Sequence, residues 1–274
     1  MTFTGTELAL LAGLLVLTGG AAGVLAGLLG VGGGIVIVPV LYWVLGALDF
    51  PEATAMAIAV ATSLATIIPT SVSSARAHAR RGNLDRALLR AWAPFVVAGA
   101  LAGGLLSFVL DGTDLTAIFG VVALVVALNM AVPRTLVLGP ALPASKPVQG
   151  LIAAAIGGVS ALMGIGGGTL TVPTLSLFSY PTHRAVGTAA AFGLAIAVPG
   201  VAGFVASGWS DPLRPPGSLG YVSLPAAAVI ASVTVFAAPV GARLAHALPA
   251  RRLRIAFAAF LGLTAIRMLW GVLT

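Results

Sequence analysis

Ten apolar segments follow one another along this chain of 274 residues, and most of them are long enough to cross a lipid bilayer. A transmembrane helix needs about 20 predominantly apolar residues. The lipid interior admits only helices and closed barrels, and the alternating pattern of a barrel strand is absent from the sequence. We therefore expect an all-α integral membrane protein with eight to ten transmembrane helices. The segments span residues 7–29, 35–48, 53–75, 88–110, 115–132, 148–164, 169–180, 185–207, 219–242 and 253–273.

The composition excludes an ordinary soluble domain. Charged residues make up 8% of the chain, whereas soluble domains carry about 25%. The formal net charge is +7, and the basic residues gather between the apolar segments, which indicates membrane topology rather than a nucleic-acid partner. The absence of cysteine excludes disulfides, thiol chemistry and thiolate metal sites. We expect no cofactor and, because the first residues lack a basic region, no cleaved signal peptide.

The charged loops predict the orientation in the membrane. The loop 76–90 holds five arginines against a single acid, Asp85, and such basic loops lie in the cytoplasm. Counting passes from this loop places the acidic stretch 111–114 outside and the arginine-rich stretch 243–254 inside. Every strongly basic loop then lies on one side, and both termini lie outside. We expect a multi-pass protein of the plasma (inner) membrane with this orientation.

The most specific motif in the chain occurs twice. GVGGGIVIVPVL at 30–41 returns as GIGGGTLTVPTL at 164–175. Each glycine run directly precedes a segment that is too short to cross a bilayer comfortably, 35–48 or 169–180. Glycine adopts backbone conformations that other residues avoid. The two runs therefore predict broken helices, each followed by a half-helix that either crosses the membrane or re-enters it.

The repeat divides the chain into two membrane halves, 1–132 and 148–274, joined by a Pro-rich linker at 133–147 that we expect in the cytoplasm. Each half has five segments, an odd number, so the second half is expected to be inverted relative to the first. Inverted repeats are typical of secondary transporters, whose substrate site lies near the membrane midplane where the halves meet. An old duplication without mechanistic meaning is the alternative interpretation.

The start of the half-helix after each glycine run is the candidate binding site. The first N–H groups of a helix have no intrahelical partner and carry the positive end of its dipole, so they favour an anion. Two such ends would face each other from opposite sides of the membrane, and hydroxyl side chains on a neighbouring segment could complete the site. The candidate substrate-binding residues are Gly32, Gly33, Gly34, Thr62, Ser63, Gly166, Gly167, Gly168 and Thr169.

Packing is the alternative explanation for the glycines. The series Gly19–Gly23–Gly27 and Gly99–Gly103 have the spacing that lets helices approach closely, and hydroxyl side chains in a helix commonly bond back to their own backbone. Charged residues deep in the segments are nearly absent, so no acid indicates a proton or cation site. The sequence contains no catalytic or metal-binding motif, so we do not expect an enzyme.

The chain as a whole resembles the TauE/SafE family of sulfite-exporter-like permeases. The resemblance is carried by GLLGVGGGIVIVPVL, its echo ALMGIGGGTLTVPTL, RGNLDRALL and LPARRLRIAFAAFLGLTAIRMLW. It implies an inner-membrane transporter of sulfur-containing anions such as sulfite, sulfoacetate or other organosulfonates. Family members often carry a Thr-Ser pair in the third segment of each half, which Thr62 and Ser63 match. In the second half, aligning 57–69 with 187–199 gives Phe192 and Gly193 instead, with Thr188 nearby.

The sequence thus predicts a secondary transporter that moves a small sulfur-containing anion by alternating access. An anion channel, a carrier of another small organic anion and a membrane scaffold are the alternatives. The expected partners are the anion and the lipid bilayer, and a coupling proton or ion and a homodimer are compatible with the sequence. The identity of the anion and the direction of transport stay open at this point.

Overall fold

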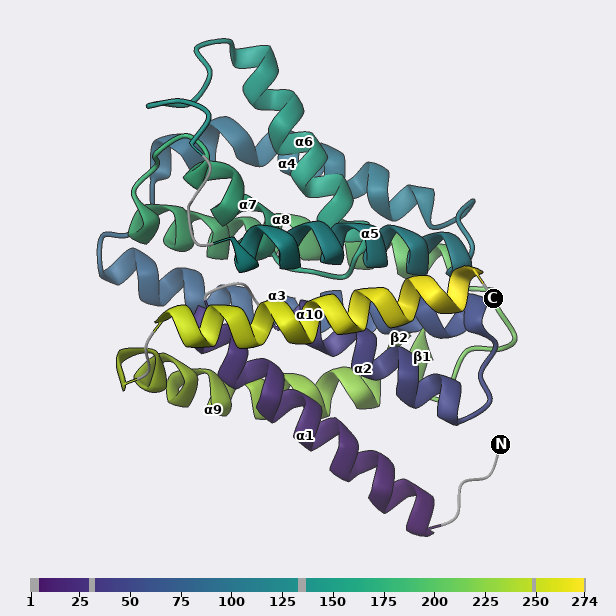
Figure 1. Ribbon diagram of the computed structural model, residues 1–274. Coiled ribbons are helices and arrows are strands. Elements are labelled where there is room, and N and C mark those ends of the chain that lie inside the picture. Colours follow the sequence, from purple (N-terminus) through teal and green to yellow (C-terminus); the bar gives the residue numbers. More distant parts are fainter. Residues whose placement is uncertain (1–4, 30–32, 133–136, 248–249, 274) are drawn as a thin grey trace.

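Helices make up almost all of the computed structural model, which describes residues 5–29, 33–132, 137–247 and 250–273 (Figure 1). Each of the ten predicted apolar segments coincides with a helix, so the all-α prediction is confirmed. The helices are α1 (Gly5–Leu29), α2 (Gly34–Ala47), α3 (Glu52–Arg80), α4 (Arg86–Leu106), α5 (Gly112–Ala131), α6 (Lys146–Leu162), α7 (Gly167–Ser176), α8 (Thr182–Ser207), α9 (Leu224–Ala247) and α10 (Ala250–Leu273).

The ninth helix begins later than the sequence predicts. An antiparallel hairpin of two short strands, β1 (Ser218–Leu219) and β2 (Val222–Ser223), occupies the first residues of the expected segment 219–242. Gly220, at the turn of the hairpin, has a φ of 55°, which is in the left-handed region that glycine adopts without strain. The hairpin brings Ser223 into contact with the centre of the molecule, as described below.

The helices carry enough apolar length to cross a membrane. Within the described residues, α3, α4, α5, α8 and the Ile255–Leu273 part of α10 are each long and apolar enough to span, and four shorter apolar helices accompany them. Large apolar side chains such as Leu151 on α6 and Phe236 on α9 are exposed on the outer surface. Exposed apolar surface on this scale is typical of contact with lipid rather than water.

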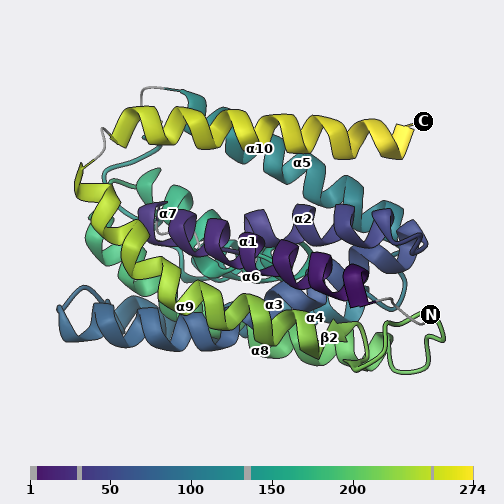
Figure 2. The ribbon, with the colours of Figure 1, turned by 90° about the horizontal axis from the view of Figure 1, so that it is seen from below.

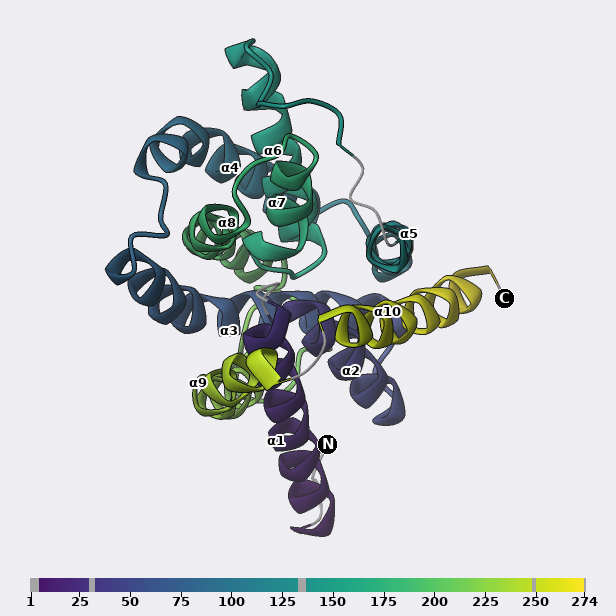
Figure 3. The same ribbon diagram turned by 60° about the vertical axis from the view of Figure 1, so that its left-hand side comes forward.

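The central pair of helices, α3 and α8, runs through the middle of the bundle, and the other helices pack in pairs around it. Helix α1 packs on α9, α4 packs on α6, and α2 and α7 pack on α3 and α8 respectively. Helices α5 and α10 pair along one edge of the bundle (Figures 2 and 3). If α1–α5 are exchanged for α6–α10 in order, each of these helix pairs is replaced by another pair that is also in contact.

Glycines mediate the closest helix contacts, as their spacing predicts. A Cβ on Gly19 of α1 would lie 3.0 Å from the Val233 Cβ of α9. A Cβ on Gly99 of α4 would lie 2.8 Å from the Ala154 Cα of α6, and one on Gly103 would lie 3.1 Å from the Gly158 Cα. These contacts advance in the same direction along both helices, so α4 and α6 are parallel. The packing role expected for these series is therefore confirmed; the packing of Gly27 falls outside the description.

The loops sort by charge between the two ends of the bundle. The start of α1, the end of α10 and the loops after α2, α4 and α8 lie at the right-hand end in Figure 1. The loops after α3 and α7, together with the adjoining ends of α9 and α10, lie at the left-hand end. The left-hand end therefore carries the arginine-rich stretches, and we call it the basic end. This grouping, with the parallel packing of α4 and α6, supports the inverted arrangement of the halves.

Candidate functional site

The second glycine motif breaks the chain between α6 and α7. At the end of α6 the Ile165 N–H donates to the Ser160 carbonyl (3.0 Å) and the Gly164 N–H donates to the Ala161 carbonyl (3.2 Å). This pair of bonds is a Schellman C-cap, which requires a left-handed residue, and Gly164 supplies it with a φ of 66°. Gly166 is extended (φ −77°, ψ 172°) and precedes the first residue of α7. The predicted break is therefore confirmed here.

The first glycine motif lies between two separate helices, α1 and α2. Helix α1 ends at Leu29 and α2 begins at Gly34, with Gly33 as its N-terminal cap residue. A Cβ on Gly33 would lie 3.3 Å from the Ala22 Cβ, so Gly33 packs against α1. Gly32, a candidate binding residue, belongs to the stretch 30–32 outside the described residues.

The two motifs, one from each half, meet directly in the structure. A Cβ on Gly34 would overlap the carbonyl oxygen of Gly164 and would lie 3.0 Å from the Ser63 Oγ. Ser63, on α3, donates its hydroxyl hydrogen to the same Gly164 carbonyl at 2.7 Å. A Cβ on Gly164 would lie 2.8 Å from the Val60 Cα of α3. Gly34, Ser63 and Gly164 thus form a buried junction between the halves, which we call the glycine junction.

The candidate residues of the second motif surround the start of α7. Gly167, Gly168 and Thr169 are buried there, and a Cβ on Gly167 would lie 2.9 Å from the Gly193 N of α8. Gly166 has no side chain with which to cap the helix. The first N–H groups of α7 therefore point away from the helix without an intrahelical acceptor, which is the arrangement that suits an anion.

The Thr62 hydroxyl is bonded to the hairpin before α9 rather than to the backbone of a half-helix start. Its Oγ1 accepts a hydrogen bond from the Ser223 N–H at 3.0 Å, just before α9. In the second half, the Thr188 Oγ1 accepts from the Asp85 N–H at 3.0 Å, just before α4. The two bonds are equivalent, so Thr188 is the counterpart of Thr62. The sequence alignment of Thr62 with Phe192 was wrong by one helical turn.

The misalignment has a structural cause in the length of the half-helices. Helix α2 has 14 residues and α7 has 10, so α2 is one turn longer. The turns that follow them are the same, because Asp49 and Ser179 both take a left-handed φ, 59° and 55°. The extra turn of α2 is matched by an extra turn at the start of α3. Helix α3 begins ten positions before Thr62, at Glu52, whereas α8 begins six positions before Thr188, at Thr182. Sequence similarity alone carried no signal for this compensation.

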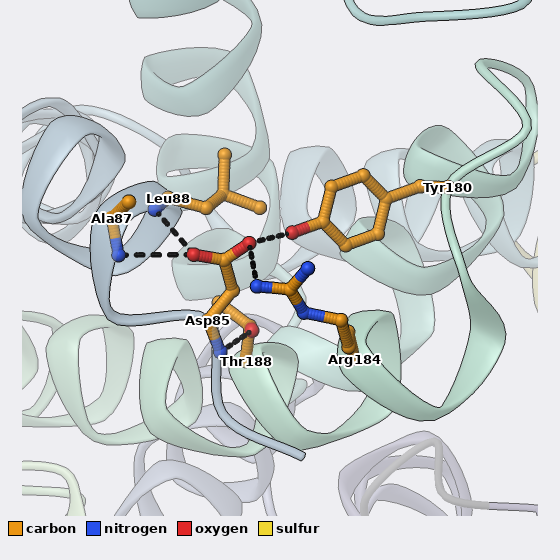
Figure 4. Close-up of polar contacts among 6 residues, drawn as sticks. All are labelled: Asp85, Ala87, Leu88, Tyr180, Arg184 and Thr188. Carbon is orange, nitrogen blue, oxygen red and sulfur yellow. Dashed lines mark hydrogen bonds and ion pairs between the residues drawn. The ribbon is translucent and has the colours of Figure 1, made fainter. Parts of the chain in front are cut away.

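Asp85 connects the halves at the basic end (Figure 4). Its Oδ1 caps α4 by accepting from the Ala87 N (2.9 Å) and the Leu88 N (3.0 Å). Its Oδ2 accepts from the Tyr180 hydroxyl and pairs with the Arg184 guanidinium at 2.9 Å. The loop after α3 is thereby tied to the loop after α7, and we call this set the Asp85 link.

The charges of the Asp85 link stabilise the ionised carboxylate. Burial would raise the pKa of the Asp85 carboxyl, but hydrogen bonds from Tyr180 and Leu88 and the charge of Arg184 outweigh it and hold that pKa below its usual value. Burial and then the hydrogen bond to Asp85 raise the pKa of Tyr180 to about 12. Sequence reasoning used Asp85 only as one acid in a basic loop. Its position just before an apolar run is an N-cap signal that could have identified part of its role.

Comparisons with known proteins agree on one family. The family model for sulfite exporter TauE/SafE matches residues 15–268. A probable membrane transporter protein of Haemophilus influenzae is 37% identical over 93% of this chain and 97% of its own length. A probable membrane transporter protein of Methanocaldococcus jannaschii is 26% identical over 96% of this chain and 97% of its own length. No solved structure matches this chain significantly. The chain belongs to the TauE/SafE sulfite exporter family and is a multi-pass membrane protein.

Proposed function

We propose that this protein is a secondary transporter that carries a small sulfur-containing anion, such as sulfite, sulfoacetate or another organosulfonate, by alternating access. The family and the names of the relatives support a membrane transporter rather than an enzyme. The observation that carries the proposal further is the glycine junction, where the half-helix breaks of both halves meet in the core. In transporters built from inverted repeats the substrate lies at such a meeting point.

The anion is held by backbone N–H groups rather than by a fixed positive charge. The proposed donors are the N–H groups of Gly167 and Gly168, which are buried at the start of α7. Each hydrogen bond to a charged group contributes about 1.5–3 kcal/mol. Two or three such bonds give a Kd in roughly the micromolar to millimolar range, which suits a carrier that must release its substrate.

Alternating access moves the halves 1–132 and 148–274 relative to each other while the linker 133–147 stays on the cytoplasmic side. Two sets of contacts join the halves, one at each end of the bundle, and each would break when the site opens to that side of the membrane. At the basic end, which we assign to the cytoplasm, the Asp85 link joins Tyr180 and Arg184 to the loop after α3. At the opposite end the neutral bond from Ser223 to Thr62 joins β2 to α3.

The proposal is tested with purified protein reconstituted into liposomes. Uptake of radiolabelled sulfite and sulfoacetate is measured with and without unlabelled anion inside the vesicles. Saturable uptake that is accelerated by internal substrate is expected of a carrier. Unsaturable flux, or single-channel currents in a planar bilayer, would favour an anion channel instead. Failure of every sulfur anion and carboxylate in a panel to bind or move would contradict the proposal.

A further inference from the structure

Successive turns on one face of α3 lie beside successive residues of the second glycine motif. Ser63 donates to the Gly164 carbonyl at 2.7 Å. One turn later, the Ile67 Cγ2 would lie 3.7 Å from a Cβ on Gly166. One further turn along α3, Ser71 lies beside Gly193 of α8, next to the start of α7. Three successive turns of the first half therefore line the chain that leads into the half-helix of the second half.

The hydroxyl of Ser71 points towards the start of α7. The position that a Cβ on Gly193 would take overlaps the Ser71 Oγ, lies 3.4 Å from the Ser71 Cβ, and lies 3.6 Å from the Gly167 N. The oxygen is closer to this position than the Ser71 Cβ is, so the side chain is directed at Gly193 of α8, beside the start of α7. Ser71 is 8% exposed, so more than nine-tenths of it is buried.

Ser71 has no hydrogen-bond partner within the part of the chain that the structure describes, whereas Ser63, Thr66 and Thr70, which precede it on α3, each have one. Thr66 donates to the Ser63 carbonyl at 2.7 Å, and Thr70 donates to the Thr66 carbonyl at 3.0 Å. Ser63 is already bonded to Gly164. The Ser71 hydroxyl is therefore available to donate to a ligand. A ligand at the start of α7 would supply the missing acceptor.

The start of α2 does not offer the same environment. The space beside Gly34 is filled by the carbonyl oxygen of Gly164, and the nearby Ser63 hydroxyl is committed to that oxygen. Gly167 at the start of α7 also packs against a backbone carbonyl, because a Cβ there would overlap the Ala189 carbonyl oxygen. The two half-helices therefore differ in their hydroxyls: the Ser63 hydroxyl beside the start of α2 is committed to Gly164, whereas the Ser71 hydroxyl beside the start of α7 has no partner among the described residues.

We propose that Ser71 is a substrate-binding residue, which donates a hydrogen bond to a small oxyanion held by the Gly167 and Gly168 N–H groups at the start of α7, and that the transporter has this one asymmetric site rather than a site at each half-helix. The inference rests on the proposed function, because it names the site of the transported anion. All donors at the site are neutral, so the anion's charge is met by dipoles, as at other helix N-termini.

The test is the Kd of sulfite and of sulfoacetate for purified wild-type protein, for Ser71→Ala and for the matched control Ser73→Ala. Ser73 lies on the same helix and is exposed. Loss of a hydrogen bond to a charged ligand is expected to weaken binding by roughly tenfold to a hundredfold in Ser71→Ala. The thermal stability should not fall, because Ser71→Ala leaves no other buried group without a partner. Ser73→Ala should bind as the wild type does.

A second variant tests the geometry from the other side. Gly193→Ala places a methyl group where the Ser71 Oγ lies, so it should displace the hydroxyl and weaken binding as well. If the wild type binds an anion and Ser71→Ala binds it equally well, the inference is overturned while the proposed function survives. If the wild type binds no anion in the panel, the proposed function fails and the inference fails with it.

Discussion

Replacing Gly164 by alanine tests whether the break before α7 has the conformation and packing described. Gly164 has a φ of 66°, and a left-handed conformation costs a non-glycine residue about 1–2 kcal/mol. The new Cβ would lie 2.8 Å from the Val60 Cα and 2.9 Å from the Val38 Cγ2. Overpacking of this kind costs about 1–3 kcal/mol. After subtracting about 0.4–1 kcal/mol for the stiffer unfolded chain, we expect a net loss of about 1–4.5 kcal/mol.

Two control variants separate the two causes. Gly82 has a φ of 71° and nothing within 4 Å of the added Cβ, so Gly82→Ala isolates the backbone cost and should destabilise the protein by about 1 kcal/mol. Gly13 lies inside α1 with nothing within 4 Å of the added Cβ. Gly13→Ala should therefore stabilise the protein by about 0.5–1 kcal/mol, because alanine favours a helix.

The assay is reversible unfolding of the purified protein in mixed micelles, followed by tryptophan fluorescence. The expected order of stability is Gly13→Ala, wild type, Gly82→Ala and then Gly164→Ala. A Gly164→Ala protein within about 0.5 kcal/mol of the wild type would refute the reasoning, because neither a left-handed backbone nor close packing against α3 could then exist at this position.

Further predictions concern the links between the halves and the helix contacts. Asp85→Asn should lower the melting temperature at pH 7 and remove the part of its pH dependence that Asp85 causes. The pKa of Asp85 is lowered in the folded protein, so its stabilising contribution is present above about pH 4 and is lost as the pH falls through the folded pKa. Melting temperatures that are equal for the variant and the wild type at every pH from 7 to 3 would contradict this. Thr62→Val and Thr188→Val each leave one backbone N–H without its acceptor and should cost about 1–3 kcal/mol each in the same unfolding assay; a large difference between them would argue against their equivalence. Gly157→Ala places a Cβ 2.9 Å from the Val96 carbonyl carbon and should reduce the yield of folded protein on size-exclusion chromatography, whereas an unchanged yield would show that α4 and α6 can separate.

The fold was largely predictable because the bilayer leaves few choices. Apolar length located every helix, and glycine chemistry located the break that Gly164 makes after α6. The grouping of loops by charge agrees with the counts made from 76–90. The hairpin before α9 was missed because two residues per strand leave no periodic pattern to detect.

The candidate site was only partly predictable. The motifs predicted that helices begin after the two glycine runs, because a run of glycines interrupts a helix. The contact between Gly34 and Gly164, the one-turn offset that makes Thr188 the counterpart of Thr62, and the direction of the Ser71 hydroxyl depend on tertiary packing. No property of the neighbouring residues in the sequence distinguishes Ser71 from the other hydroxyls of α3.

The most direct test of the account is to locate a bound anion with selenite, a sulfite analogue whose selenium gives an anomalous X-ray signal. Crystals of the protein soaked in selenite should show a peak within hydrogen-bonding distance of the Ser71 Oγ and the Gly167 N, and excess sulfite should remove it. A peak beside Gly34 at the start of α2, or peaks confined to the loops at the basic end, would contradict the assignment of the anion to the start of α7.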